Sequence, residues 1–266
     1  MLTKPVLYLF VIPNFFFSLY LTLKKKNIKI ILTSLLSIAF VIGYCGWNYQ
    51  RTGYFHYSSI QNSNLLNYNL YYFLINKKGE DFANKTIEEI DKKVENMSYR
   101  EKNKYIKEIA IKILLKEHLP SYSIFHLKGI FCFFLDPGRF DLQSFFGFKK
   151  ARGKGLFYQY SKFGLRGVFS YLKEQSIFLI LLLIPILFFN LLKFLSLFFF
   201  FFNKKIDLEI KIFFLLLIGY LSFLSAPLGA SRYALPILPI LIFAFLNSSI
   251  ILYLPKANYS INSHNK

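Results

Sequence analysis

Arg232 is the residue of this chain that is best placed to do chemistry. It lies in the segment APLGASRYALPILP, residues 226–239, directly before the last apolar stretch. The charge pattern described below places this segment outside the cytoplasm, where short loops seldom contain Arg because positive charge is retained on the cytoplasmic side. A planar guanidinium can bind a phosphate through two parallel hydrogen bonds. Arg232, together with Tyr233, is therefore predicted to bind a lipid phosphate.

Two further groups of polar residues are candidate contacts. Asp136 and Asp141 flank a Pro-Gly turn signal next to an apolar segment. They form either a solvated turn with a helix-capping Asp, or a contact to an acceptor or a metal ion. Arg51 and His56 follow the second apolar stretch. They either touch a donor or belong to the aromatic and basic belt that is common at membrane interfaces.

The composition is that of a membrane protein. The 266 residues are 55% hydrophobic and 20% aromatic, which is far from the values of a soluble domain. The net charge of +19 favours anionic membrane lipids as partners over nucleic acid, because no nucleic-acid-binding motif accompanies it. Neither Cys45 and Cys132 nor the four His show metal-ligand spacing, so no cofactor is predicted and a divalent metal is not indicated.

Five apolar stretches approach or exceed the length of about 20 residues that crosses a bilayer. Lysines cluster after the first stretch, at Lys24–Lys29, and after the third, at Lys204–Lys211, and both loops are therefore predicted to be cytoplasmic. The prediction is a multi-pass protein of the cytoplasmic membrane, with the long middle segment outside and the carboxyl terminus inside. The stretches are Val6–Leu23, Ile30–Trp47, Ile177–Phe202, Ile212–Leu228 and Ala234–Leu254.

The fold class that follows is all-α, with about five transmembrane helices and an external helical insertion. Residues 1–47 form two transmembrane helices, 48–176 the external segment, 177–254 three transmembrane helices and 255–266 a cytoplasmic tail.

Within the external segment, Thr86–Glu89 and Ser98–Glu101 both match the capping box that starts a helix. The apolar runs Ser123–Leu135 and Leu156–Leu172 are interpreted as interfacial helices because charged residues interrupt them.

At several points the chain resembles bacterial glycosyltransferase family 39 proteins, which are relatives of protein O-mannosyltransferases and lipid A aminoarabinose transferases. The motifs occur in the same order along nearly the whole chain, although each is short. They are LTKP at 2–5, GWNYQRTGYF at 46–55, YREKNKY at 99–105 running into IAIKI at 109–113, HLPSY at 118–122 and RYALPILP at 232–239.

The resemblance implies a GT-C type enzyme that transfers a sugar from a polyprenyl phosphate donor at the outer face of the membrane. Proteins of this kind use an Asp in their first external loop as the essential carboxylate. This sequence has no counterpart of that Asp, so the chain resembles a carboxyl-terminal portion of such an enzyme and its catalytic residues are unknown. In the reaction, Arg232 would stabilise the negative charge that develops on the departing phosphate.

Two alternative functions remain open. One is a noncatalytic membrane protein with the same spans and the same Arg232 loop. The other is a carrier-lipid polysaccharide ligase, polymerase or transporter component, which would also bind a polyprenyl phosphate at an external Arg. The sequence specifies neither the sugar, the acceptor nor the oligomeric state.

Overall fold

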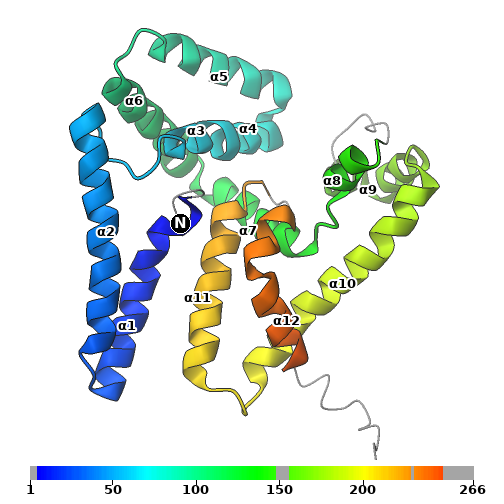
Figure 1. The fold of residues 1–266 in the computed structure, drawn as a ribbon. Helices are drawn as coiled ribbons and strands as arrows, with labels where there is room; N and C mark the ends of the chain where they lie inside the picture. Colours follow the sequence, from blue (N-terminus) through cyan, green and yellow to red (C-terminus); the bar gives the residue numbers. More distant parts are fainter. Residues whose placement is uncertain (1–4, 148–155, 229–230, 248–266) are drawn as a thin grey trace, which may run out of the picture. The chain divides into compact units, whose positions relative to one another are not determined.

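The computed structural model describes residues 5–147, 156–228 and 231–247, and the regular structure of these residues is entirely helical (Figure 1). Most helices are α-helices, η1 and η4 are 3-10 helices, and η2 and η3 are π-helices. In chain order the elements are η1 Pro5–Phe10, α1 Val11–Lys25, α2 Lys29–Thr52, α3 Gln61–Asn64, η2 Leu65–Leu70, α4 Tyr71–Lys78, α5 Glu80–Val94, α6 Tyr99–Ile111, η3 Lys112–Glu117, α7 Leu119–Leu135, α8 Arg139–Phe145, α9 Leu156–Lys173, α10 Ile177–Phe202, α11 Leu208–Ser225, η4 Ser231–Ile237 and α12 Leu238–Leu246.

The chain divides into two compact units, which are described separately. The first unit contains Met1–Phe134 and Ile212–Ala234, and the second contains Leu135–Lys211 and Leu235–Lys266. A segment that is distant in sequence, most of α11, therefore completes the first unit.

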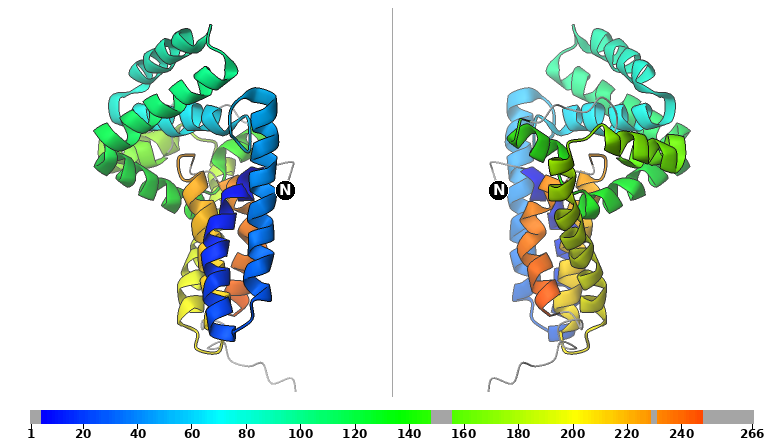
Figure 2. Two further views of the ribbon diagram at one scale, coloured as in Figure 1. Left: turned by 90° about the vertical axis from the view of Figure 1, so that its left-hand side faces the viewer. Right: turned by 90° about the vertical axis from the view of Figure 1, so that its right-hand side faces the viewer.

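An apolar helical hairpin begins the first unit. Helix α1 ends at Lys26, which adopts a left-handed conformation with φ 51°, and α2 runs back beside α1 (Figure 2). Phe17 packs against Phe213 of α11, while Phe10 packs against Tyr220. Because Phe10, which directly precedes α1, reaches the later residue Tyr220 while Phe17 in α1 meets the earlier Phe213, the η1–α1 segment and α11 are antiparallel. The ends of α2 and α11 therefore lie on the same side of this bundle, opposite the Lys24–Lys29 turn.

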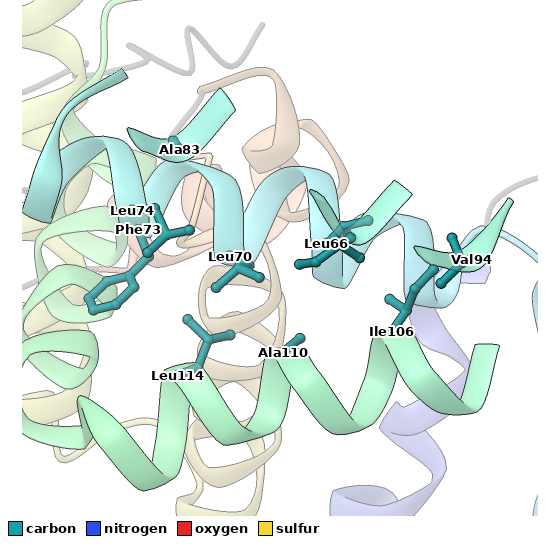
Figure 3. Packing of buried hydrophobic residues seen from close by; sticks show 10 residues of the cluster. Leu66, Leu70, Phe73, Leu74, Ala83, Val94, Ile106, Ala110 and Leu114 are labelled. Atoms are coloured by element: carbon teal, nitrogen blue, oxygen red, sulfur yellow. The ribbon is translucent and has the colours of Figure 1, made fainter. Parts of the chain in front are cut away.

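Residues 53–118 of the first unit form a helical subdomain with its own apolar core. Residues spaced by four along η2 and α4, and again along α6 and η3, face one another across this core (Figure 3). Burying each of the larger side chains stabilises the subdomain by about 1.5–3 kcal/mol. The buried cluster consists of Leu66, Leu70, Phe73, Leu74, Ala83, Ile90, Val94, Ile106, Ala110 and Leu114.

Polar contacts fix the edge of this subdomain. The buried Asn62 of α3 donates hydrogen bonds through Nδ2 to the side chain of Asn103 in α6 at 2.9 Å and to the hydroxyl of Tyr54 at 3.2 Å. The predicted capping box at Ser98 is confirmed, because the Ser98 hydroxyl accepts from the Glu101 backbone N–H while the Glu101 carboxylate accepts from the Ser98 N–H. These hydrogen bonds hold the pKa of Glu101 below its usual value, with the Ser98 side chain as the largest cause.

The capping box predicted at Thr86 is wrong. Helix α5 already begins at Glu80, after Gly79 with φ 96°, and continues through Thr86. The Thr86 hydroxyl donates to the carbonyl of Phe82, one turn earlier. The earlier start brings the fully buried Ala83 into the core, and this packing outweighs the local signal at Thr86.

In the second unit, the parallel helices α10 and α12 pack against each other. Phe200 contacts Phe243, and three residues further on Asn203 donates from Nδ2 to the carbonyl of Asn247 at 2.7 Å. Contacts that advance in the same direction along both helices show that the pair is parallel. Helix α9 of the same unit is interrupted at Gly164, whose φ of 62° is not helical.

Among the described residues, four helices are long and apolar enough to cross a membrane: Leu7–Lys25, Lys29–Thr52, Ile177–Phe202 and Leu208–Ser225. They correspond to four of the five predicted spans, with ends shifted by a few residues. The fifth prediction, Ala234–Leu254, coincides with a shorter apolar helix, Tyr233–Leu246, and its last residues lie outside the described part of the chain. Helix α7, predicted from Ser123, begins at Leu119 and is also short.

Helix α7 approaches the chain after α11 closely within the first unit. A Cβ added at Gly129 would collide with the backbone carbonyl of Ala226, whereas one added at Gly43 in α2 would meet nothing within 4 Å. The glycine at 129 is therefore required by close packing.

Gly129→Ala is expected to destabilise the protein by roughly 1–3 kcal/mol, because the backbone around Ala226 must move to admit the methyl group. Gly43→Ala is the matched control and is expected to be neutral or slightly stabilising, since Ala is the better helix former. Thermal unfolding of the full chain in detergent measures both. Equal melting temperatures for the two variants would contradict the close contact.

Candidate functional site

The predicted pair Asp136 and Asp141 occupies two different environments in the second unit. Asp136 is half-buried and forms a turn, in which its Oδ1 accepts from the backbone N–H of Gly138 at 3.2 Å. Gly138 has φ 73°, a conformation that favours glycine. Asp141 is exposed in the first turn of α8, where a negative charge stabilises the helix dipole. The turn is therefore present, but α8 has Gly138 at its N-cap and no side-chain cap hydrogen bond, so neither Asp caps the helix. A contact to an acceptor or a metal ion stays a prediction.

The backbone of this turn is held by the apolar helix α10. Asn190 is buried within α10 and donates from Nδ2 to the carbonyl oxygen of Asp136 at 2.9 Å. An amide in the middle of an apolar helix is thereby satisfied by a carbonyl that follows the end of α7. The contact fixes the start of α8 relative to α10.

Arg139, between the two aspartates, is a buried cation that the sequence interpretation did not single out. Its side chain is only 7% exposed, and its guanidinium carbon lies 5.1 Å from the centre of the Tyr171 ring in α9. Such cation–π contacts strengthen when the cation is desolvated. Burial lowers the pKa of Arg139, and the nearby charge of Asp136 opposes this effect.

A second contact joins α8 to the segment that follows α9. Gln143, which is 2% exposed, donates from Nε2 to Oε1 of Gln175 at 3.0 Å. Arg139 and Gln143 are four residues apart in α8 and so share a helix face, while Gln175 lies two residues beyond the end of α9 and donates to the Tyr171 carbonyl. The two contacts build a compact polar cluster, the Arg139 cluster, which consists of Arg139, Gln143, Tyr171 and Gln175.

Arg51 and His56, the second pair of predicted contacts, lie in different environments. Arg51 is exposed in the last turn of α2, where a positive charge complements the helix dipole. His56 is buried, and its Nδ1 lies 2.7 Å from the carbonyl of Tyr54, which requires the proton on Nδ1. Its Nε2 then accepts from the Tyr99 hydroxyl at 3.2 Å. Nδ1 thus braces the loop after α2 internally, and Nε2 ties that loop to Tyr99 of α6.

Arg232 and Tyr233 lie in the 3-10 helix η4, between α11 and the apolar α12. The side chain of Arg232 lies outside the part of the structure that is described, and only its backbone conformation is defined. Tyr233 is half-buried, and Pro236 is contained in the same 3-10 helix.

A buried histidine in α7 is a further polar residue of the first unit. His126 lies 2.8 Å through Nε2 from the carbonyl of Phe223 in α11, so the proton resides on Nε2. Burial lowers the pKa of His126, and the hydrogen bond to Phe223 opposes this shift. The residue had appeared in the sequence only as an interruption of an apolar run; its role depends on α11, which follows almost a hundred residues later.

An open apolar groove of about 410 Å³ runs along α2. All of its lining residues come from one face of this single candidate span, which in a bilayer would meet lipid or another helix. They are Leu36, Ala39, Phe40, Gly43, Tyr44 and Trp47.

Within residues 5–147, 156–228 and 231–247 there is no group of three or more His, Cys, Asp or Glu side chains that could hold a metal ion. The chain matches no protein-family model, no curated protein and no solved structure. Its function must therefore be argued from the placement of its own residues.

The buried, neutral His126 predicts a pH-dependent stability. Because the pKa is depressed in the folded state, the unfolded chain takes up the proton first as the pH falls through about 6.5, and folding stability is lost. The melting temperature should thus decrease between pH 7.5 and pH 5.5. His126→Gln keeps an N–H donor for Phe223 without a titrating group, and should show a weaker decrease. An identical pH dependence in both proteins would rule out His126 as its source.

Proposed function

We propose that this chain is a membrane protein that binds a polyprenyl-phosphate-linked sugar at Arg232 and takes part in transfer of that sugar at the outer face of the membrane. The observation that carries the proposal is the position of Arg232 in η4, the next helical element after α11 and seven residues beyond its last residue, Ser225. An α-helix of 18 residues is about 27 Å long, close to the roughly 30 Å of a bilayer core. If α11 crosses a bilayer, a residue soon after its end is expected at the depth of lipid phosphates.

The arrangement of the first unit supports the proposal that Arg232 lies on the external side of the membrane. Since α1 is antiparallel to both α2 and α11, Arg232 follows a helix end on the side opposite the Lys24–Lys29 turn. The positive-inside rule assigns that turn to the cytoplasm. Arg232 and the helical subdomain, residues 53–118, are then both external, as an enzyme using an external donor and acceptor requires.

The chemistry of the proposed role is electrostatic. When a sugar leaves a polyprenyl phosphate, negative charge grows on the phosphate oxygens. Arg232 offers two parallel N–H donors to these oxygens, and Tyr233 adds a hydroxyl or ring contact. The general base of the transfer is not assigned to any residue of this chain.

Arg232→Gln is expected to weaken binding of a polyprenyl phosphate by about tenfold or more, because a charge-assisted hydrogen bond is lost. Native mass spectrometry of the full chain released from detergent measures lipid retention. Arg100→Gln is the matched control, since Arg100 is an exposed cation of the same unit. Unchanged retention in Arg232→Gln would contradict the phosphate assignment; binding without sugar transfer to any acceptor would instead favour a noncatalytic role.

The orientation is tested separately. A single cysteine introduced as Arg232→Cys, with Cys45 and Cys132 replaced by Ser, should react with a membrane-impermeant maleimide added to intact cells. Reaction only after the membrane is opened would place this position inside and remove the proposed donor site.

A further inference from the structure

We propose that the Arg139 cluster is a second ligand site, which binds a phosphodiester carrying neighbouring hydroxyls, the chemistry of a polyol phosphate headgroup. The site is built from α8 and the end of α9 in the second unit. It does not depend on Arg232 or on sugar transfer.

The positive charge of the site is supplied by Arg139. This guanidinium is more than nine-tenths buried and lies over the Tyr171 ring. A planar guanidinium with its five N–H donors matches two phosphate oxygens at once. Asp136 already contributes one negative charge nearby, so a monoanionic phosphodiester suits the cluster better than a dianionic phosphate.

The hydroxyl requirement comes from two buried polar atoms. Gln143 Oε1 and the Tyr171 hydroxyl are both buried, and the described part of the protein gives neither a hydrogen-bond partner. A buried polar atom that stays unpaired is destabilising, so such atoms usually serve a ligand or solvent. Gln143 Oε1 can only accept, which calls for a donor such as a ligand hydroxyl. The Tyr171 hydroxyl can donate to a phosphate oxygen.

The frame that holds these groups is independent of the ligand. Gln143 Nε2 is bound to Gln175, and Gln175 in turn donates to the backbone carbonyl of Tyr171. The hydrogen bond from its amide nitrogen orients the Gln143 side chain. The amide oxygen remains available for a further contact. Positioning of this kind lowers the entropy that a ligand must overcome on binding.

The outer side of α8 points to a lipid as the source of the headgroup. Phe145 is 81% exposed and Phe146 is 46% exposed, next to the candidate span α10. Exposed aromatic side chains beside a transmembrane helix typically lie at the membrane interface. A helix anchored there holds Arg139 and Gln143 at headgroup depth, and phosphatidylglycerol combines a phosphodiester with two hydroxyls.

The experiment measures binding of phosphatidylglycerol, phosphatidylcholine and the soluble phosphodiester glycerophosphoglycerol to the full chain in detergent, by native mass spectrometry and by the shift in melting temperature. Phosphatidylglycerol is expected to bind at least about fivefold more tightly than phosphatidylcholine. Competition by glycerophosphoglycerol at equal strength would identify a soluble polyol phosphodiester as the ligand. Equal binding of the two lipids, without glycerophosphoglycerol binding, overturns the proposal.

Tyr171→Phe is the decisive variant, because it keeps the ring beneath Arg139 and removes only the hydroxyl. It should weaken phosphatidylglycerol binding by about fivefold to tenfold, while its melting temperature without lipid stays equal or rises. Arg139→Gln should weaken binding at least as much, and Arg166→Gln, which removes an exposed cation of α9, should not. Wild-type binding in Tyr171→Phe overturns the proposal. Arg232→Gln should leave this binding unchanged, so failure here is distinguishable from failure of the proposed donor site.

Discussion

Side-chain N–H groups that donate to backbone carbonyls hold the breaks between helices in this protein. Asn48 binds the carbonyl of His56 after α2, His126 binds that of Phe223 near the end of α11, Asn190 binds that of Asp136 after α7, and Asn203 binds that of Asn247 at the end of α12. Carbonyls at helix ends lack helical partners, and an unsatisfied carbonyl is especially unfavourable where water is scarce. Each donor thereby satisfies a carbonyl at or near the end of an apolar helix.

Sequence patterns were sufficient wherever a feature depends on neighbouring residues. Hydropathy located the four candidate spans because about 20 consecutive apolar residues leave few alternatives. The capping box at Ser98 was recognisable since all of its atoms lie within four residues. Thr86 matched the same motif, yet the helix began earlier because burial of Ala83 decided its start. A local motif thus predicts a helix start only when tertiary packing agrees with it.

The polar sites could not be predicted to the same extent, because they depend on segments that meet only in the folded chain. Asp136 and Asp141 attracted attention as carboxylates, whereas the buried charge of the turn belongs to Arg139, between them. The ring beside Arg139 belongs to Tyr171, about thirty residues later in the chain. No periodic pattern in the sequence relates these two residues. His56 was likewise predicted as a candidate donor contact. In the structure it forms hydrogen bonds to Tyr54 in its own loop and to Tyr99 of α6, and so holds the loop in place.

The parallel pairing of α10 with α12 constrains the order in which the chain can assemble. Two parallel helices joined through α11 cannot pack together until α11 has crossed back and α12 has followed it. During synthesis α10 is therefore complete before its partner exists, and the Phe200 face can be covered by α12 only after that later helix has been made. Formation of this contact is consequently a late event, set by the arrival of α12 and not by that of α10.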